Sequence, residues 1–266
     1  MKKLFALPLA AFAIAACSES TAPESVADLN PSYAKPVKPP SGGGVTPATT
    51  QVAFFQFNGE IEAQAGAGLG TDTDDGSIQG NASDLHFVPS NLSNGFVGRF
   101  NNTKTRIILT PTAAVSKYTV DFDLYVIGSW DGRGKQAQSG YFDANVFQVG
   151  YRCSGGAVTP IFTTTFSNQL TVQQDFPLTF LNGGNKAGTG AVKGSIDALG
   201  YADRPDLSHT PSFRSFGDAT YHLTYTIAND CAGGVAPQFV FSSTAPGQQS
   251  NYDESWGIDN LKLFAN

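Results

Sequence analysis

The stretch K-Y-T-V-D-F-D-L-Y-V-I-G-S-W-D-G, residues 117–132, decides the fold of this chain. Successive side chains of an extended strand point to opposite faces, so residues two apart share a face. One face here is apolar and the other mostly polar: Tyr118, Val120, Phe122, Leu124 and Val126 against Thr119, Asp121, Asp123 and Tyr125. This alternation predicts a half-buried β-strand that ends at Gly128 and leads into a turn containing Trp130.

Further strands are expected on both sides of this one. The chain has 29 Gly and one Met, and beyond its N-terminus no segment shows the i, i+3, i+4 apolar spacing of a helix. Runs of β-branched and aromatic residues predict strands at residues 52–61, 85–88, 96–100, 106–110, 144–151, 161–166, 220–227, 239–241 and 261–264. Roughly nine to twelve strands of this kind favour an all-β domain of two packed antiparallel sheets.

The connections between these strands are rich in Gly and Pro. Residues 66–80 and 177–218 are expected to be loops, and a loop as long as the second is usually functional or mobile. A second Trp turn, E-S-W-G-I-D-N at residues 254–260, is expected to lead into the last strand. In the strand at 220–227, His222 falls on the polar face and is expected at the surface.

The N-terminus has the pattern of an export signal. Lys2 and Lys3 precede an apolar run, residues 4–16, that is too short to span a bilayer as a helix. The run ends in I-A-A-C, which resembles the lipobox of bacterial lipoproteins and implies a signal peptide at 1–16 and a lipid on Cys17. Ser18 in place of Asp resembles lipoproteins of the outer membrane. An ordinary secretory signal remains the alternative.

Residues 17–50 are expected to be a disordered tether, because they are rich in Pro, Gly and Ser and poor in large apolar residues. The expected r.m.s. reach of such a segment is about 30 Å. The globular domain is therefore expected at residues 51–266.

Cys153 and Cys231 remain once Cys17 is assigned to the lipid. An even pair of cysteines in an exported chain favours a disulfide over two free thiols.

The charge balance limits the partners. The precursor carries a formal charge of −6, and removal of residues 1–16 leaves 14 basic and 22 acidic side chains, or −8. Nucleic acid and anionic lipid headgroups are therefore poor partners, because phosphate binding needs clustered Lys or Arg.

Five separated segments resemble secreted bacterial jelly-roll domains akin to the concanavalin A-like lectin and glucanase superfamily and to carbohydrate-binding modules. They are F-V-G-R-F at 96–100, F-D-L-Y-V-I-G-S-W-D-G at 122–132, T-T-F-S-N at 164–168, G-D-A-T-Y-H-L at 217–223 and D-E-S-W-G-I-D-N-L-K-L at 253–263. The resemblance implies a jelly-roll β-sandwich and a carbohydrate ligand.

Aromatic side chains in or beside Gly-rich turns are the candidate ligand-binding residues. Flat rings offer apolar platforms for the faces of sugars, and indoles serve equally well as core-rim residues. The candidates are Trp130, Tyr141, Tyr201 and Trp256.

Carboxylates beside the Trp turns are candidate ligands of a structural Ca²⁺, which prefers oxygen donors. They are Asp131, Asp143, Glu254 and Asp259. Solvated or N–H-capping carboxylates are the alternative.

A catalytic alternative rests on Glu60 and Glu62. Glucanases of the superfamily carry E-[ILV]-D-x-x-E on one strand, and carboxylates two residues apart lie roughly 6 to 7 Å from each other. Gln64 lies near the place of the last acid of that motif and cannot act as acid or nucleophile.

Together these features predict an outer-membrane lipoprotein whose non-catalytic lectin-like domain binds carbohydrate or another envelope component. A glucanase-type glycoside hydrolase and a purely structural or adhesive surface protein are the alternatives.

Overall fold

The computed structural model describes residues 50–57, 64–73, 87–88, 95–100, 105–137, 140–142, 144–154, 156–201, 216–244 and 254–266. Residues 1–49, with the predicted signal peptide and Cys17, lie outside the described residues, as do Glu60, Glu62 and Asp143. The described strands are β1 (Thr50–Phe55), β2 (Ala67–Thr73), β3 (Phe87–Val88), β4 (Phe96–Phe100), β5 (Thr105–Pro111), β6 (Lys117–Gly128), β7 (Lys135–Ala137), β8 (Gly140–Phe142), β9 (Val146–Cys153), β10 (Thr159–Thr165), β11 (Asp218–Ala228), β12 (Pro237–Thr244) and β13 (Glu254–Ala265).

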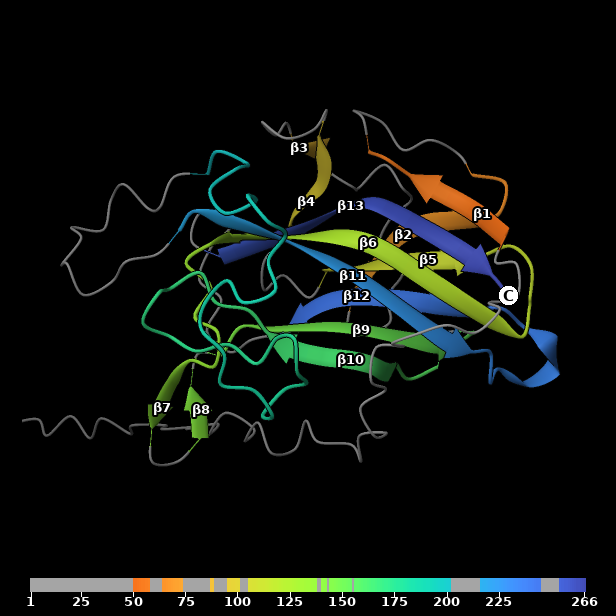
Figure 1. The fold of residues 1–266 in the computed structure, drawn as a ribbon. Coiled ribbons are helices and arrows are strands. Elements are labelled where there is room, and N and C mark those ends of the chain that lie inside the picture. The colour runs from red at the N-terminus through yellow and green to blue at the C-terminus, as the bar shows by residue number, and fades with distance from the viewer. Residues whose placement is uncertain are drawn as a thin grey trace, which may run out of the picture. The chain divides into compact units, whose positions relative to one another are not determined.

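The strands form the predicted all-β sandwich of two antiparallel sheets (Figure 1). The first sheet has the order β11-β6-β13-β4-β3, with β1 paired to β13, and the second has the order β10-β9-β12-β5-β2. Strands β7 and β8 form a separate hairpin. Among the described residues, no helix is long and apolar enough to cross a membrane.

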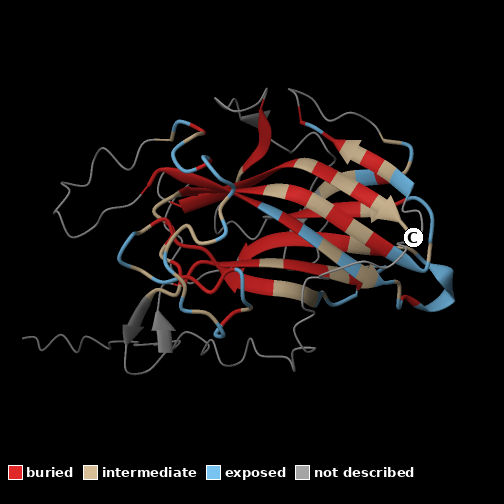
Figure 2. Ribbon diagram, viewed as in Figure 1, coloured by how far each residue is buried: buried red, intermediate tan, exposed pale blue. Residues whose placement is uncertain are grey.

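Strand β6 is an interior strand of the first sheet and has the predicted bounds. It pairs with β11 on one side and β13 on the other. Its burial alternates as the sequence predicts from Lys117 to Leu124, and all five residues of its apolar face belong to the core (Figure 2). Tyr125, which was expected on the polar face, is buried as well. We call the opposite face of this sheet, which carries Thr119, Asp121 and Asp123, the outer face.

Aromatic rings join the two sheets. Phe122 of β6 packs against Phe241 of β12 with ring centroids 5.0 Å apart, and Tyr118 packs against Phe239 at 5.8 Å. All four side chains are buried. Burial of each large apolar side chain contributes about 1.5–3 kcal/mol, so this contact between the sheets is a main source of stability.

Two predictions about strands and turns are wrong, and one hairpin was missed. Residues 66–80 were expected to be a loop but contain β2, which pairs with β5 along its whole length. Residues 254–260 were expected to be a turn, whereas β13 already begins at Glu254. The hairpin of β7 and β8 was not predicted at all.

The predicted disulfide between Cys153 and Cys231 is present, with the Cα atoms 5.5 Å apart. It ties the end of β9 to the loop around the 3₁₀ helix η3 (Ala232–Gly234). Disulfides persist in oxidising compartments, so this bond indicates a protein that folds outside the cytoplasm.

Residues 167–201, which we call the cap, run as an irregular segment over two edge strands (teal in Figure 1). The backbone N–H of Phe176 donates to Thr165 O of β10 at 3.1 Å. The backbone N–H of Val192 donates to Thr220 O of β11 at 2.8 Å. The cap therefore bonds to the edges of both sheets, and the irregular structure predicted for this region is confirmed where it is described.

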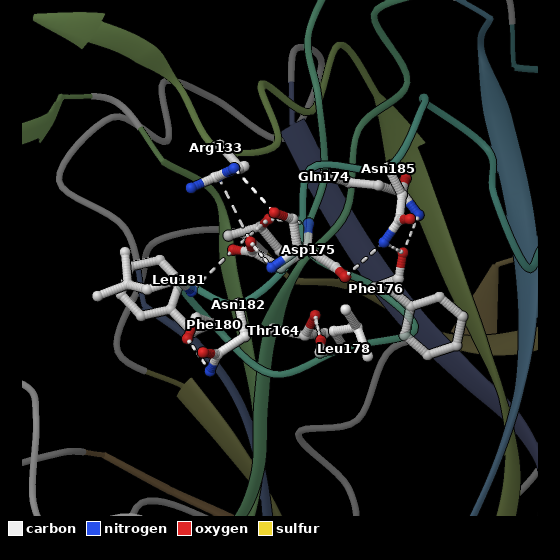
Figure 3. Close-up of polar contacts among 12 residues, drawn as sticks. Arg133, Thr164, Gln174, Asp175, Phe176, Leu178, Phe180, Leu181, Asn182 and Asn185 are labelled. Carbon is white, nitrogen blue, oxygen red and sulfur yellow. Dashed lines mark hydrogen bonds and ion pairs between the residues drawn. The ribbon is translucent and has the colours of Figure 1, made fainter. Parts of the chain in front are cut away.

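Buried polar side chains hold the cap in shape. Asp175 is completely buried, and its carboxylate accepts hydrogen bonds from the N–H groups of Leu181 (3.2 Å) and Gly183 (2.9 Å) and from the Thr165 hydroxyl (3.1 Å) (Figure 3). The Arg133 Nε atom lies 3.4 Å from the same carboxylate. Buried polar groups with partners of this kind fix one conformation of a loop.

Candidate functional site

A continuous set of polar side chains crosses three strands on the outer face of the first sheet. We call it the polar network, and its members are Asp121, Asp123, His222, Thr224, Asn260 and Lys262. They come from β6, β11 and β13, so a rigid sheet positions them rather than a loop. Sites built on strands hold their side chains more precisely than sites on loops.

His222 lies on the edge strand β11, bridges the two carboxylates of β6 and is exposed, as predicted. Its Nδ1 atom lies 2.8 Å from an oxygen of Asp123 and its Nε2 atom lies 3.0 Å from an oxygen of Asp121. A neutral imidazole has one N–H donor and an imidazolium has two, so only the charged ring donates to both carboxylates at once.

The two carboxylates also accept hydrogen bonds from other members of the network. Lys262 Nζ lies 3.3 Å from Asp121, and the Thr224 hydroxyl donates to the same carboxylate at 2.7 Å. Asn260 donates through its amide to Asp123 at 2.8 Å. Donors and acceptors thus alternate across the face.

A β-bulge in β13 places Asn260 at this position. The register with β6 shifts between Asp259 and Lys262, so two residues of β13 stand opposite one residue of β6. Asn260 adopts a φ of +51°, a left-handed conformation in which Asn is enriched. The next residue, Leu261, stays fully buried in the core. Bulges are frequent next to functional sites because they turn a single side chain out of its expected direction.

One end of the outer face is covered by aromatic side chains. The Tyr125 hydroxyl donates to the buried carboxylate of Asp259 at 3.1 Å, and the Tyr125 ring packs against Phe96. Tyr201 of the cap packs edge-on against Phe96 and lies under the Arg99 guanidinium, 4.8 Å from its ring centroid. The structure thus places Tyr201, a predicted ligand-binding residue, against the small apolar cluster that contains Phe96 and Tyr125.

The Tyr201 hydroxyl is buried and has no hydrogen-bond partner among the described residues. Burial raises the pKa of Tyr201, the positive charge of Arg99 opposes that rise, and the Asp218 carboxylate adds to it. The phenol therefore stays protonated at neutral pH and can donate a hydrogen bond.

At the other end of the face, the half-buried ring of Phe54 on β1 lies beside the network. The ammonium group of Lys262 lies 5.4 Å from the centroid of this ring. Lys262 therefore connects the aromatic ring of β1 to the carboxylate of Asp121.

Trp130 and Trp256 are predicted ligand-binding residues, but both side chains are 0% exposed. Trp130 does follow β6 in a turn, but its indole N–H donates to Ser255 O inside the protein at 2.9 Å. Trp256 lies within β13 and packs against Phe100 and Phe147. Neither indole offers a face to a ligand unless the sandwich opens. Tyr141 lies in β8.

The predicted metal ligands do not form one site where they are described. Asn145 links Asp131 and Glu254, by accepting from the Asp131 N–H and donating to Glu254 at 2.9 Å. Asp259 lies five residues further along β13, about 17 Å from Glu254. Among the described residues, no three His, Cys, Asp or Glu side chains gather so that they could hold a metal ion.

Sequence comparison gives no family for this chain, since no family model and no curated protein matches it. A solved structure to which it is similar is the K1 cleaved adhesin domain of Lys-gingipain from Porphyromonas gingivalis W83. The identity is 13%, the TM-score is 0.37, and the match covers 82% of this chain and 99% of that chain. A likeness this low carries no functional argument.

Proposed function

We propose that this protein is a non-catalytic carbohydrate-binding protein of the cell envelope and that its ligand binds to the polar network. The observation that carries the proposal is the β-bulge that holds the Asn260 amide beside Asp123 and His222. Sugars are bound by a few fixed polar groups that set their orientation, with apolar surface alongside. The carboxylates, imidazole and amide supply the polar groups, and Phe54 supplies apolar surface at the edge.

The surroundings of the two acids favour binding over cleavage. In a glycosidase, one carboxylic acid must donate a proton, and apolar surroundings commonly keep it protonated. Asp121 and Asp123 are instead surrounded by donors, including Lys262 and His222. Anchoring in the outer membrane through a lipid on Cys17 is part of the proposal and rests on the sequence.

The test is a glycan array probed with the purified full chain, followed by titration of the best glycan. Asn260→Gly removes the amide but suits the left-handed backbone, so its melting temperature should stay close to that of the wild type. We expect Asn260→Gly and Asp123→Asn to weaken binding at least tenfold, because a site that is built to hydrogen-bond a hydroxyl loses strongly when one group is removed.

Thr226→Val is the matched control, because Thr226 lies on the same face of β11, four residues or about 13 Å from His222. It should leave binding unchanged. If no glycan binds, or if binding is unchanged in Asn260→Gly and Asp123→Asn, the proposed site is wrong. Release of reducing ends that disappears in Glu60→Gln or Glu62→Gln would support the hydrolase instead.

A further inference from the structure

The cap exposes a concentration of aliphatic side chains. The described part of the chain has six large apolar side chains that are well exposed, and five of them belong to the cap. These five are Leu170 (56% exposed), Leu178 (50%), Leu181 (38%), Val192 (42%) and Ile196 (45%). The sixth, Val235 (45%), lies just after η3. Single exposed apolar residues are ordinary, whereas large contiguous apolar patches mark interaction sites. Five such residues in one short segment make the cap the candidate for a site of this kind.

These side chains are held on a fixed backbone. Leu181 adopts a φ of +69°, and its N–H is bonded to the buried Asp175 carboxylate (Figure 3). On the other half of the cap, Val192 is bonded through its N–H to β11. The halves meet where the Phe176 ring lies against Gly190. A surface that is already ordered loses little conformational entropy on binding.

The exposed charges of the cap differ in sign from those of the whole chain. Lys186 and Lys193 are exposed, and Asp197 is the exposed acid of the cap. Asp175 is buried and paired with Arg133. The cap thus presents two cations and one carboxylate, whereas the chain carries a net charge of −6. Exposed aliphatic side chains can insert at the interface of a bilayer, and each Lys near an anionic surface adds to the attraction.

We propose that the cap is a membrane-binding surface, with its aliphatic side chains in the interface of a lipid bilayer and its lysines at anionic headgroups. The position of the predicted lipid supports a bilayer as the partner of the cap, because Cys17 lies only 33 residues before Thr50. A segment of that length keeps the domain near the bilayer, and weak contacts are then sufficient because the effective concentration is high. The net charge of −6 makes anionic headgroups a poor partner for the chain as a whole. Charges far from the cap, however, act over more than a Debye length and are screened by salt, so the local charge of the cap decides. The proposal is independent of glycan binding, which involves another surface.

Photo-crosslinking of the full chain tests this directly. The crosslinking residue p-benzoylphenylalanine is placed at Leu178, at Val192 and, as the matched control, at Val235, which has a similar exposure outside the cap. Each protein is mixed with vesicles of phosphatidylethanolamine and phosphatidylglycerol and irradiated, and lipid adducts are measured by mass spectrometry. We expect at least fivefold more lipid adduct from Leu178 and Val192 than from Val235.

A second arm uses Lys186→Gln combined with Lys193→Gln, which should lower the yield of adducts at Leu178 at least threefold and reduce its dependence on phosphatidylglycerol. Equal lipid adducts at all three positions, or an absence of lipid adducts from the cap, would overturn the proposal. The same experiment in cell envelopes distinguishes a protein partner, since adducts to protein in place of lipid would also overturn it.

Discussion

Replacement of Asp175 by Ala should be among the most destabilising single substitutions in this protein. The side chain is 0% exposed, and its loss removes the acceptor for two backbone N–H groups, one hydroxyl and the Arg133 guanidinium. Removing one partner of a buried ion pair costs about 3–5 kcal/mol. Arg133 is 18% exposed and also donates to Gly183 O, so we expect the lower end of that range, about 3 kcal/mol.

Urea unfolding measures this loss, and limited proteolysis reports whether the cap opens before the sandwich. Asp197→Gly is the control, because Asp197 is an exposed acid of the same cap whose carboxylate accepts from one N–H group, that of Gly217, and Gly suits its left-handed φ of +57°. Its loss should cost about 1 kcal/mol or less. Asp175→Ala combined with Arg133→Met should cost less than the sum of the single changes, because no unpaired charge remains. A loss below about 1 kcal/mol for Asp175→Ala would refute the reasoning.

Three further predictions concern other parts of the sandwich. Cys153→Ser combined with Cys231→Ser removes a disulfide between residues 78 apart in the sequence and should lower the unfolding free energy by about 4–5 kcal/mol in the chain-entropy model. Chemical denaturation against the oxidised wild type measures this loss, and a loss near zero would contradict the prediction. Trp130→Phe should destabilise the protein by about 1 kcal/mol more than Trp256→Phe. The reason is that Trp130 donates a buried hydrogen bond, whereas the Trp256 indole N–H has no acceptor in the described structure. A larger loss of stability for Trp256→Phe in urea unfolding would exclude this explanation. Burial raises the pKa of Asp218 above 3.8 despite the backbone N–H donors of Leu199, Tyr201 and Ala198. Its contribution to stability is therefore lost as the pH rises through that raised pKa. The difference in unfolding free energy between wild type and Asp218→Asn should therefore fall as the pH rises from about 4 through the raised pKa. A difference that stays constant over this range would contradict the prediction.

Local alternation was sufficient to predict β6, because its pattern depends only on which face meets the core. The same reasoning failed for the start of β13, where Gly257 was interpreted as part of a turn. A Cβ atom on Gly257 would lie 2.4 Å from the ring of Phe96, so the glycine allows a close approach within a strand. That requirement comes from another strand and leaves no signal nearby in the sequence.

The candidate site was predictable only in part. Alternation placed Asp121, Asp123 and His222 on polar strand faces, but nothing in the sequence showed that β6 and β11 are neighbours. The bulge at Asn260 appears only in the register of β13 against β6. The two Trp residues were misplaced for a related reason, since the burial of an indole depends on strands far away in the sequence.

The cap also bears on how many copies of this protein can be crowded together. An uncovered edge strand presents backbone N–H and C=O groups that a second molecule can use to extend the sheet. In β10 and β11, backbone groups at Thr163, Thr165, Asp218 and Thr220 are already bonded to the cap. At these positions the chain carries its own protection against edge-to-edge polymerisation. That protection suits the anchored protein proposed above, whose copies would be confined to the two dimensions of a membrane surface.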